Sequence, residues 1–220
     1  MDFAERYYRL KSELPGNVRL LAVSKFHPES MIREAYGAGQ RIFGENRVQE
    51  LLLKYEHLPK DIEWHFIGHL QANKVKYIAP FIHTIQSIDS LKLAETVNRE
   101  AEKCGRKIRI LLQIHIAQEE QKFGFSYDEA EDLLKKGVLS SMKYLEISGL
   151  MGIATLTDDQ TQIHNEFHRL HVFFQQIKND YFTADDSFSE LSAGMSDDYP
   201  VAIEEGSTLI RIGSKLFGPR

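Results

Sequence analysis

The first residue that could carry covalent chemistry is a lysine at the end of an apolar segment. Lys25 follows the β-rich residues 18–24 and comes shortly before Pro28, where a helix is expected to begin. A lysine that is partly removed from water at such a strand end has its ammonium form disfavoured, and its neutral amine can attack a carbonyl carbon to form a Schiff base. A solvated lysine at a strand end is the plainer alternative.

Two segments near the C-terminus combine glycine with hydroxyl side chains. Residues 191–196 include Ser192, Met195 and Ser196, and residues 206–214 include Gly213. Glycine lets backbone N–H groups approach a phosphate group, and hydroxyl groups complete such a cradle. The two segments therefore predict a phosphate site, with a pair of ordinary turns as the alternative.

Three further polar residues lie where a ligand could reach them. Arg211 interrupts an apolar strand on the same face as Leu209 and Gly213. Its guanidinium needs an acceptor there, either a carboxylate of a structural salt bridge or a ring nitrogen of a bound cofactor. Asn46 follows the second apolar segment and could cap the next helix or line a site. His65 could touch a ligand or lie satisfied in the core.

A row of histidines at helical spacing resembles a metal-binding face. His164, His168 and His171 share one side of the helix expected at residues 160–181, but Asn165 stands where a metalloprotease helix requires glutamate. The single cysteine, Cys104, cannot supply the thiolate pair of a zinc deaminase. We therefore expect a polar outer helix face and no metal site.

These residues need a scaffold that brings distant segments together. Apolar β-rich segments alternate with longer amphipathic stretches, which predicts parallel β–α units. Eight such units in 220 residues suit a closed (β/α)8 barrel, a single α/β domain over residues 1–220, better than an open sheet. The strand candidates are residues 18–24, 41–43, 63–67, 82–87, 108–115, 145–149, 189–192 and 209–212, and the helix candidates include residues 28–38, 47–55, 90–104, 127–136 and 160–181. The third unit is weak, because residues 74–80 leave room for only a short helix.

The composition narrows the class of protein. Hydrophobic residues make up 42% and charged residues 27% of the chain, as in ordinary globular proteins. The net charge of -5 disfavours a nucleic-acid binder. The lone cysteine indicates a reducing compartment, and no apolar run approaches the ~20 residues that span a bilayer. We expect a cytoplasmic protein that contacts no membrane.

Six motifs, taken in chain order, together resemble one family. They are residues 22–25, residues 43–46 with Gln49 and Glu50, residues 64–68 with residues 70–71 and 73–74, residues 148–152, residues 194–196, and residues 206–218. This pattern is similar to the pyridoxal phosphate homeostasis proteins (YggS/PROSC type). Ala193 departs from the methionine that is usual there, and Phe26 and His27 vary the residues after the lysine.

The resemblance implies a fold-type III barrel, like the N-terminal domain of alanine racemase, that holds pyridoxal 5′-phosphate (PLP) covalently on Lys25. It also implies the roles of the other cofactor-binding residues. Ser192, Met195, Ser196 and Gly213 match the phosphate-holding loops, Arg211 matches the arginine that faces the pyridine nitrogen, and Asn46, His65 and Met151 match pocket-lining positions.

The function implied by the resemblance is PLP homeostasis, as a cofactor carrier and regulator without established turnover. An arginine at the pyridine nitrogen opposes ring protonation and weakens the electron sink of PLP chemistry. A racemase of this fold also needs a second domain, for which we expect no room. A small PLP-dependent amino-acid racemase or lyase is the alternative, and the phosphate-like loops disfavour a cofactor-free aldolase. Expected partners are PLP and PLP-dependent apo-enzymes, with the chain a monomer or at most a weak dimer.

Overall fold

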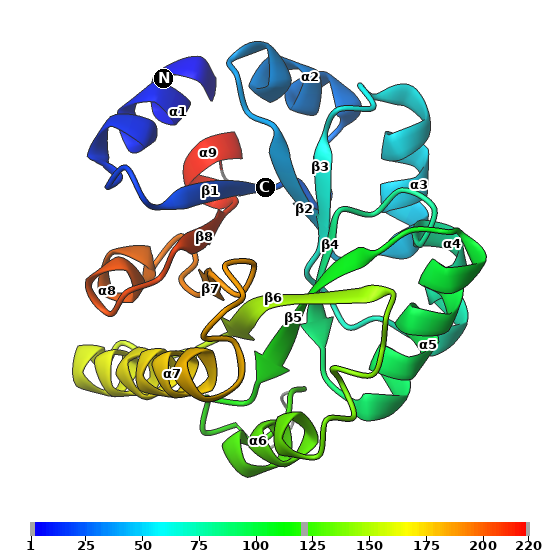
Figure 1. The fold of residues 1–220 in the computed structure, drawn as a ribbon. Helices are drawn as coiled ribbons and strands as arrows, with labels where there is room; N and C mark the ends of the chain where they lie inside the picture. The colour runs from blue at the N-terminus through cyan, green and yellow to red at the C-terminus, as the bar shows by residue number, and fades with distance from the viewer. Residues whose placement is uncertain (1–2, 120–122, 219–220) are drawn as a thin grey trace.

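Eight parallel strands pair in chain order, and β8 pairs with β1 to close a barrel. The computed structural model describes residues 3–119 and 123–218, and Figure 1 shows the strands surrounded by helices. The strands are β1 (Arg19–Val23), β2 (Ile42–Glu45), β3 (Glu63–Phe66), β4 (Thr84–Ile88), β5 (Ile108–Ile114), β6 (Leu145–Gly152), β7 (Glu190–Ser192) and β8 (Leu209–Ile212). The predicted barrel is confirmed, and each predicted segment overlaps one strand, although β2, β4 and β6 continue beyond the predicted ends.

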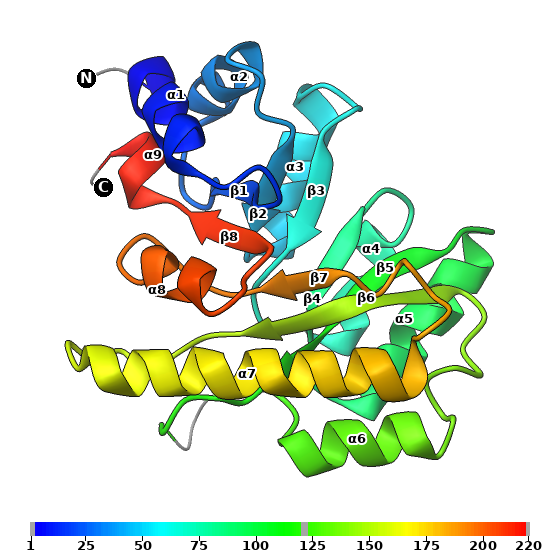
Figure 2. The ribbon, with the colours of Figure 1, turned by 60° about the vertical axis from the view of Figure 1, so that its left-hand side comes forward.

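Helices follow the strands and cover the outside of the barrel. They are α1 (Phe3–Glu13), α2 (Glu29–Gly37), α3 (Val48–His57), α4 (Val75–Ile78), α5 (Leu91–Lys103), α6 (Tyr127–Lys135), α7 (Gln160–Tyr181), α8 (Tyr199–Glu204) and α9 (Ser214–Phe217), with the 3-10 turn η1 (Ala72–Lys74). The long α7 crosses the whole side of the barrel in Figure 2. As predicted, the third unit carries only a short helix. Among the described residues, no helix has the length and hydropathy to cross a bilayer.

Strand alternation separates an inner from an outer core. Leu209 packs with Leu21 and Val23 in a small cluster of its own, while Ile210 and Ile212 join the large core beneath the helices. Residues at odd and even positions of β8 therefore face opposite sides, which confirms the predicted alternation. Arg211 lies on the inner side with Leu209.

The β5–β6 pair contains an extra residue that bends the barrel wall. Ile110 pairs with Ile147 but Leu111 pairs with Gly149, so Ser148 is bulged. Gly149 has φ +153°, and a Cβ there would lie 1.7 Å from the carbonyl oxygen of Glu190. Only glycine lets β7 approach β6 this closely.

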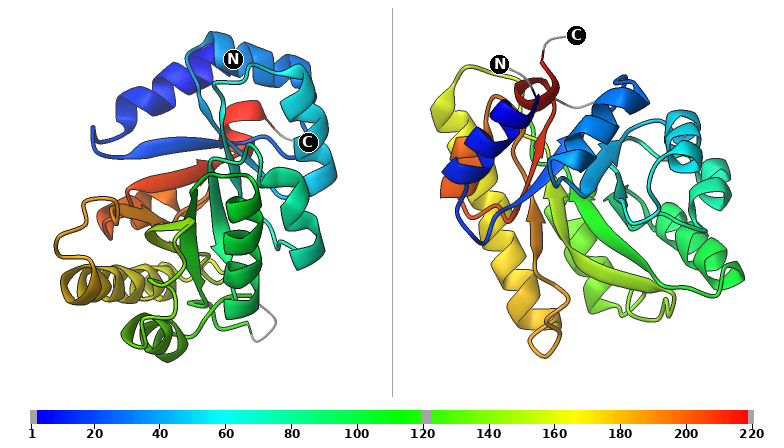
Figure 3. Two further views of the ribbon diagram at one scale, coloured as in Figure 1. Left: turned by 45° about the vertical axis from the view of Figure 1, so that its right-hand side comes forward. Right: turned by 90° about the horizontal axis from the view of Figure 1, so that it is seen from above.

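Both described ends of the chain lie on one side of the barrel. The ring of Phe3 in α1 lies 5.2 Å from that of Phe217 in α9. Figure 3 shows α1 and α9 adjacent in both views. The segment that follows β8 is thereby held by the first helix.

Candidate functional site

Lys25 lies two residues beyond the end of β1, at the carboxyl end of the barrel. Lys25 is half-buried, while the preceding Ser24 is buried and the following Phe26 is exposed. Phe26 has φ +66° and is the only non-glycine residue with positive φ in the part of the chain that the structure describes. The backbone therefore turns sharply at the residue after the lysine.

A buried ion-pair network lies directly behind this turn. Lys54 Nζ lies 2.7 Å from Glu45 Oε1 and 2.6 Å from Glu50 Oε1, and its side chain is only 5% exposed. Ser24 Oγ donates to Glu45 Oε1 at 2.6 Å. Burial raises the pKa of Glu45, and the neighbouring Lys54 opposes that rise.

Arg211 is buried in the barrel interior beside neutral acceptors. Its guanidinium donates to Ser192 Oγ at 2.7 Å and to the carbonyl oxygen of Gly152 at 2.8 Å. Within residues 3–119 and 123–218 it forms no ion pair with a carboxylate, although the charge of Asp198 acts on it from a greater distance. Burial lowers the pKa of Arg211 to about 10. A guanidinium has five N–H donors, so hydrogen-bonding capacity remains for a further acceptor.

A chain of side-chain hydrogen bonds runs inward from Arg211. Ser192 Oγ donates to Gln86 Oε1 at 2.7 Å, and Gln86 Nε2 lies 2.8 Å from His65 Nδ1. With Gln86 as donor, the proton of a neutral His65 lies on Nε2, which has no hydrogen-bond partner among the described residues. Burial lowers the pKa of His65 well below its usual value.

Two of the predicted phosphate-loop residues meet, while Ser192 lies deeper. The backbone N–H of Gly213 donates to Ser196 Oγ at 3.4 Å, and that of Met195 donates to Asp198 Oδ1 at 2.5 Å. The Ser192 hydroxyl is fully buried and already engaged on both sides. Its contacts link it to Arg211 rather than to the Ser196–Gly213 junction.

The remaining predicted residues lie near this interior. Met151 is buried and is the register partner of Ser192. Asn46 Oδ1 is buried and has no partner among the residues that the structure describes, and its amide does not cap α3, whose N-cap is Arg47. His65 is enclosed in the barrel and is linked to Arg211 through Gln86 and Ser192.

A family model described as alanine racemase, N-terminal domain, matches residues 2–220. The pyridoxal phosphate homeostasis protein of Schizosaccharomyces pombe is 41% identical over 93% of this chain and 85% of its own length, and that of Synechocystis is 40% identical over 97% of both. The solved structure of PipY from Synechococcus elongatus without PLP is 40% identical, covers 99% of this chain and 100% of its own, and has a TM-score of 0.93. The chain belongs to the pyridoxal phosphate homeostasis protein family.

Alanine racemases share the barrel with this family at much greater distance. The racemase of Clostridium difficile is 14% identical, with a TM-score of 0.79 over 100% of this chain and 56% of its own. At this identity the likeness concerns the fold alone.

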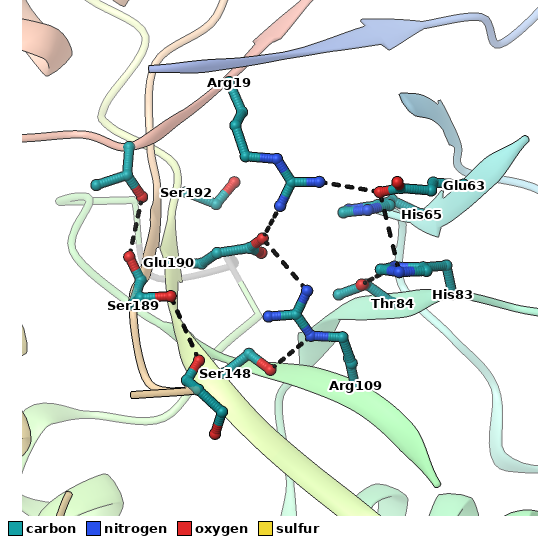
Figure 4. Close-up of polar contacts among 12 residues, drawn as sticks. Arg19, Glu63, His65, His83, Thr84, Arg109, Ser148, Ser189, Glu190 and Ser192 are labelled. Carbon is teal, nitrogen blue, oxygen red and sulfur yellow. Dashed lines mark hydrogen bonds and ion pairs between the residues drawn. The ribbon is translucent and has the colours of Figure 1, made fainter. Parts of the chain in front are cut away.

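A second set of polar residues, at the amino end of the barrel, has no counterpart in the family motifs quoted above. Figure 4 shows Arg19 between Glu63 and Glu190, with Arg109 next to Glu190. Arg109 also pairs with Glu146 at 2.9 Å. Burial raises the pKa of Glu190, against the pull of both arginines. The result is a layer of alternating charges inside the barrel, made of Arg19, Glu63, Arg109, Glu146 and Glu190, which we call the charged layer.

One part of this layer resembles a metal site. Glu63, His65 and His83 place one ligand atom each within 4.8 Å of one another. The two imidazole rings, however, stack with their planes 9° apart, so their in-plane lone pairs do not converge on one point. Arg19 Nη2 also lies 2.9 Å from Glu63 Oε2, so this carboxylate is already paired with a guanidinium. We interpret the group as part of the charged layer.

Sequence reasoning missed Gln86, Lys54 and the charged layer, and assigned no role to Glu45 or Glu50. The signal that could have found Gln86 and Glu45 is a polar residue inside an apolar strand, the same signal that identified Arg211. In the histidine row of α7, His164 and His168 each contact Glu205. His171 departs from the expected outer face, because it is half-buried against Gly206 and its Nδ1 is buried without a hydrogen-bond partner among the described residues.

Proposed function

We propose that this protein binds PLP and acts in the homeostasis of the free cofactor as a carrier and regulator in the cytoplasm. The observation that carries the proposal is the solved structure of PipY with PLP bound, which is 39% identical over 99% of this chain with a TM-score of 0.89. The reducing compartment inferred from the single cysteine supports the cytoplasm as its location.

The residues around the barrel mouth suit the chemistry of PLP. The cofactor supplies an aldehyde, a pyridine ring and a phosphate group. Lys25 provides an amine that can condense with the aldehyde, forming a C=N bond while the aldehyde oxygen leaves as water. Asn46 Oδ1, which has no partner among the described residues, can accept a hydrogen bond from a ring hydroxyl. The Ser196–Gly213 junction offers a hydroxyl and glycine backbone to a phosphate.

Arg211 supports a binding role over a catalytic one. A buried guanidinium that pairs with no carboxylate of the described residues can donate to the pyridine nitrogen, and its positive charge opposes protonation of that nitrogen. Without ring protonation the cofactor stabilises a carbanion poorly. We therefore expect negligible turnover of amino acids and exchange of PLP with apo-enzymes as the biological outcome.

The test is to find the lysine that PLP modifies. Borohydride reduction of the purified protein after incubation with PLP, followed by peptide mapping, should place the phosphopyridoxyl group on Lys25. Lys25→Ala should lose the visible imine absorption, whereas Lys215→Ala, which removes an exposed lysine in α9, should keep it.

Two results would contradict the proposal. One is modification of another lysine alone. The other is steady racemisation or elimination of a free amino acid by the unmodified protein, which would favour the racemase or lyase reading instead.

A further inference from the structure

Two side chains of α3 hold the peptide groups on both sides of Lys25. Glu50 Oε1 accepts the backbone N–H of Phe26 at 2.6 Å, and Lys54 Nζ donates to the carbonyl oxygen of Ser24 at 2.8 Å. Glu50 and Lys54 lie one helical turn apart and pair with each other at 2.6 Å. The two peptide groups that flank the Lys25 Cα atom are thus hydrogen-bonded to the two members of one ion pair.

The ammonium group of Lys54 is fully satisfied by this network. All three ammonium protons of Lys54 have an acceptor, namely Ser24 O, Glu45 Oε1 and Glu50 Oε1. Glu45 is fully buried, and burying an ion pair costs about as much desolvation energy as the pair returns. A buried charge network of this kind therefore contributes orientation more than net stability.

The backbone that Glu50 holds is strained. Phe26 adopts the left-handed conformation, φ +66°, which costs a residue with a side chain about 1–2 kcal/mol. Such a conformation persists only where the surroundings impose it. The N–H that Glu50 accepts belongs to this strained residue, so Glu50 offsets part of its cost.

We infer that Glu50 and Lys54 are positioning residues for Lys25, with Glu45 as their buried anchor. They keep the lysine backbone in one orientation, so that its amine meets a carbonyl carbon at a productive angle. A displacement of about 1 Å at a reacting group can lower a rate by about 100-fold. This inference rests on the proposed function, in which Lys25 is the reacting amine.

The experiment measures the rate of imine formation on adding PLP to the cofactor-free full chain, followed by visible absorption and by borohydride trapping at Lys25. Glu50→Ala and Glu50→Asp should both form the imine at least about tenfold more slowly, because neither places an acceptor at the Phe26 N–H. Glu50→Gln should recover most of the rate, because its amide oxygen can still accept that N–H. Glu56→Ala is the matched control, since Glu56 is an exposed glutamate of the same helix.

The outcomes separate positioning from a general loss of stability. Recovery by glutamine with slow alanine and aspartate variants supports the inference. Equal rates for Glu50→Ala and Glu56→Ala would overturn it, as would a glutamine variant as slow as alanine. Absence of any imine in the unmodified protein would overturn the proposed function itself, and this inference with it.

Discussion

The burial and the hydrogen-bond partners of Arg211 indicate a functional site at this one residue. The chain buries a guanidinium in the barrel, and among the residues that the structure describes its acceptors are one hydroxyl and one carbonyl oxygen. Its pKa falls to about 10 because burial disfavours the charged form. A residue that costs the fold free energy in this way is typical of a functional site.

Ser192 illustrates what the sequence conveys about a residue and what it does not. A serine beside glycine predicts a phosphate loop, but whether its hydroxyl faces the loop or the barrel depends on strand alternation at the end of β7. In the structure that hydroxyl accepts a hydrogen bond from Arg211 and donates one to Gln86. Its contribution to cofactor binding should therefore pass through Arg211.

Substitution of Ser192 distinguishes these two roles. Ser192→Ala should weaken the binding of pyridoxal and of PLP by a similar factor, about tenfold, because a hydrogen bond to a charged group contributes about 1.5 kcal/mol or more. Ser196→Ala should weaken PLP binding selectively. Absorbance titrations with both compounds provide the dissociation constants. A Ser192→Ala loss confined to PLP would mean that Ser192 grips the phosphate.

At the scale of elements, apolar patterning was sufficient to place every strand of the barrel. Strands of a barrel are buried on both faces, so they read as short apolar runs between amphipathic helices. A one-residue insertion such as the bulge at Ser148 leaves no periodic signal, and the predicted sixth strand accordingly stopped at Gly149 although β6 continues to Gly152. The polar network could not be predicted from the sequence either, because partners such as Arg19 and Glu190 lie 171 residues apart in the chain.

The β6–β7 contact should depend on Gly149. Gly149→Ala would drive a methyl group into the carbonyl oxygen of Glu190 and impose a strained φ, so the free energy of unfolding should fall by about 3 kcal/mol or more. Urea unfolding measures the loss. Gly16→Ala is the control, because a Cβ at Gly16 meets nothing within 4 Å. Equal stability of the two variants would contradict the close approach of β7 to β6.

Across the whole molecule, the barrel interior has two polar ends of different character. The amino end contains the alternating chain of Arg19, Glu63, Arg109 and Glu190, while Arg211 and Ser192 lie toward the mouth. Gln86 and His65 connect the two. An interior with so many buried ionisable groups couples the stability of the fold to pH.

The acid side of that dependence should be governed in large part by His65. Its pKa in the fold lies well below 6.5, chiefly because burial disfavours the charged ring and secondarily because His83, Arg19 and Arg109 repel it. As the pH falls below about 6.5 the unfolded chain takes up a proton that the native ring does not, so stability is lost at roughly 1 kcal/mol per pH unit.

The raised pKa of Glu190 acts in the direction opposite to that of His65, because its carboxyl gains a proton in the fold before it does so in the unfolded chain. His65→Gln removes the contribution of His65 and leaves that of His83, whose pKa burial also lowers, so the free energy of unfolding of the variant should decline less steeply than that of the unmodified protein between pH 7 and pH 5. Parallel curves from urea unfolding across this range would contradict this prediction, because they would mean that His65 is protonated as readily inside the barrel as in the unfolded chain. The full burial of the ring near Arg19, Arg109 and His83 requires the opposite.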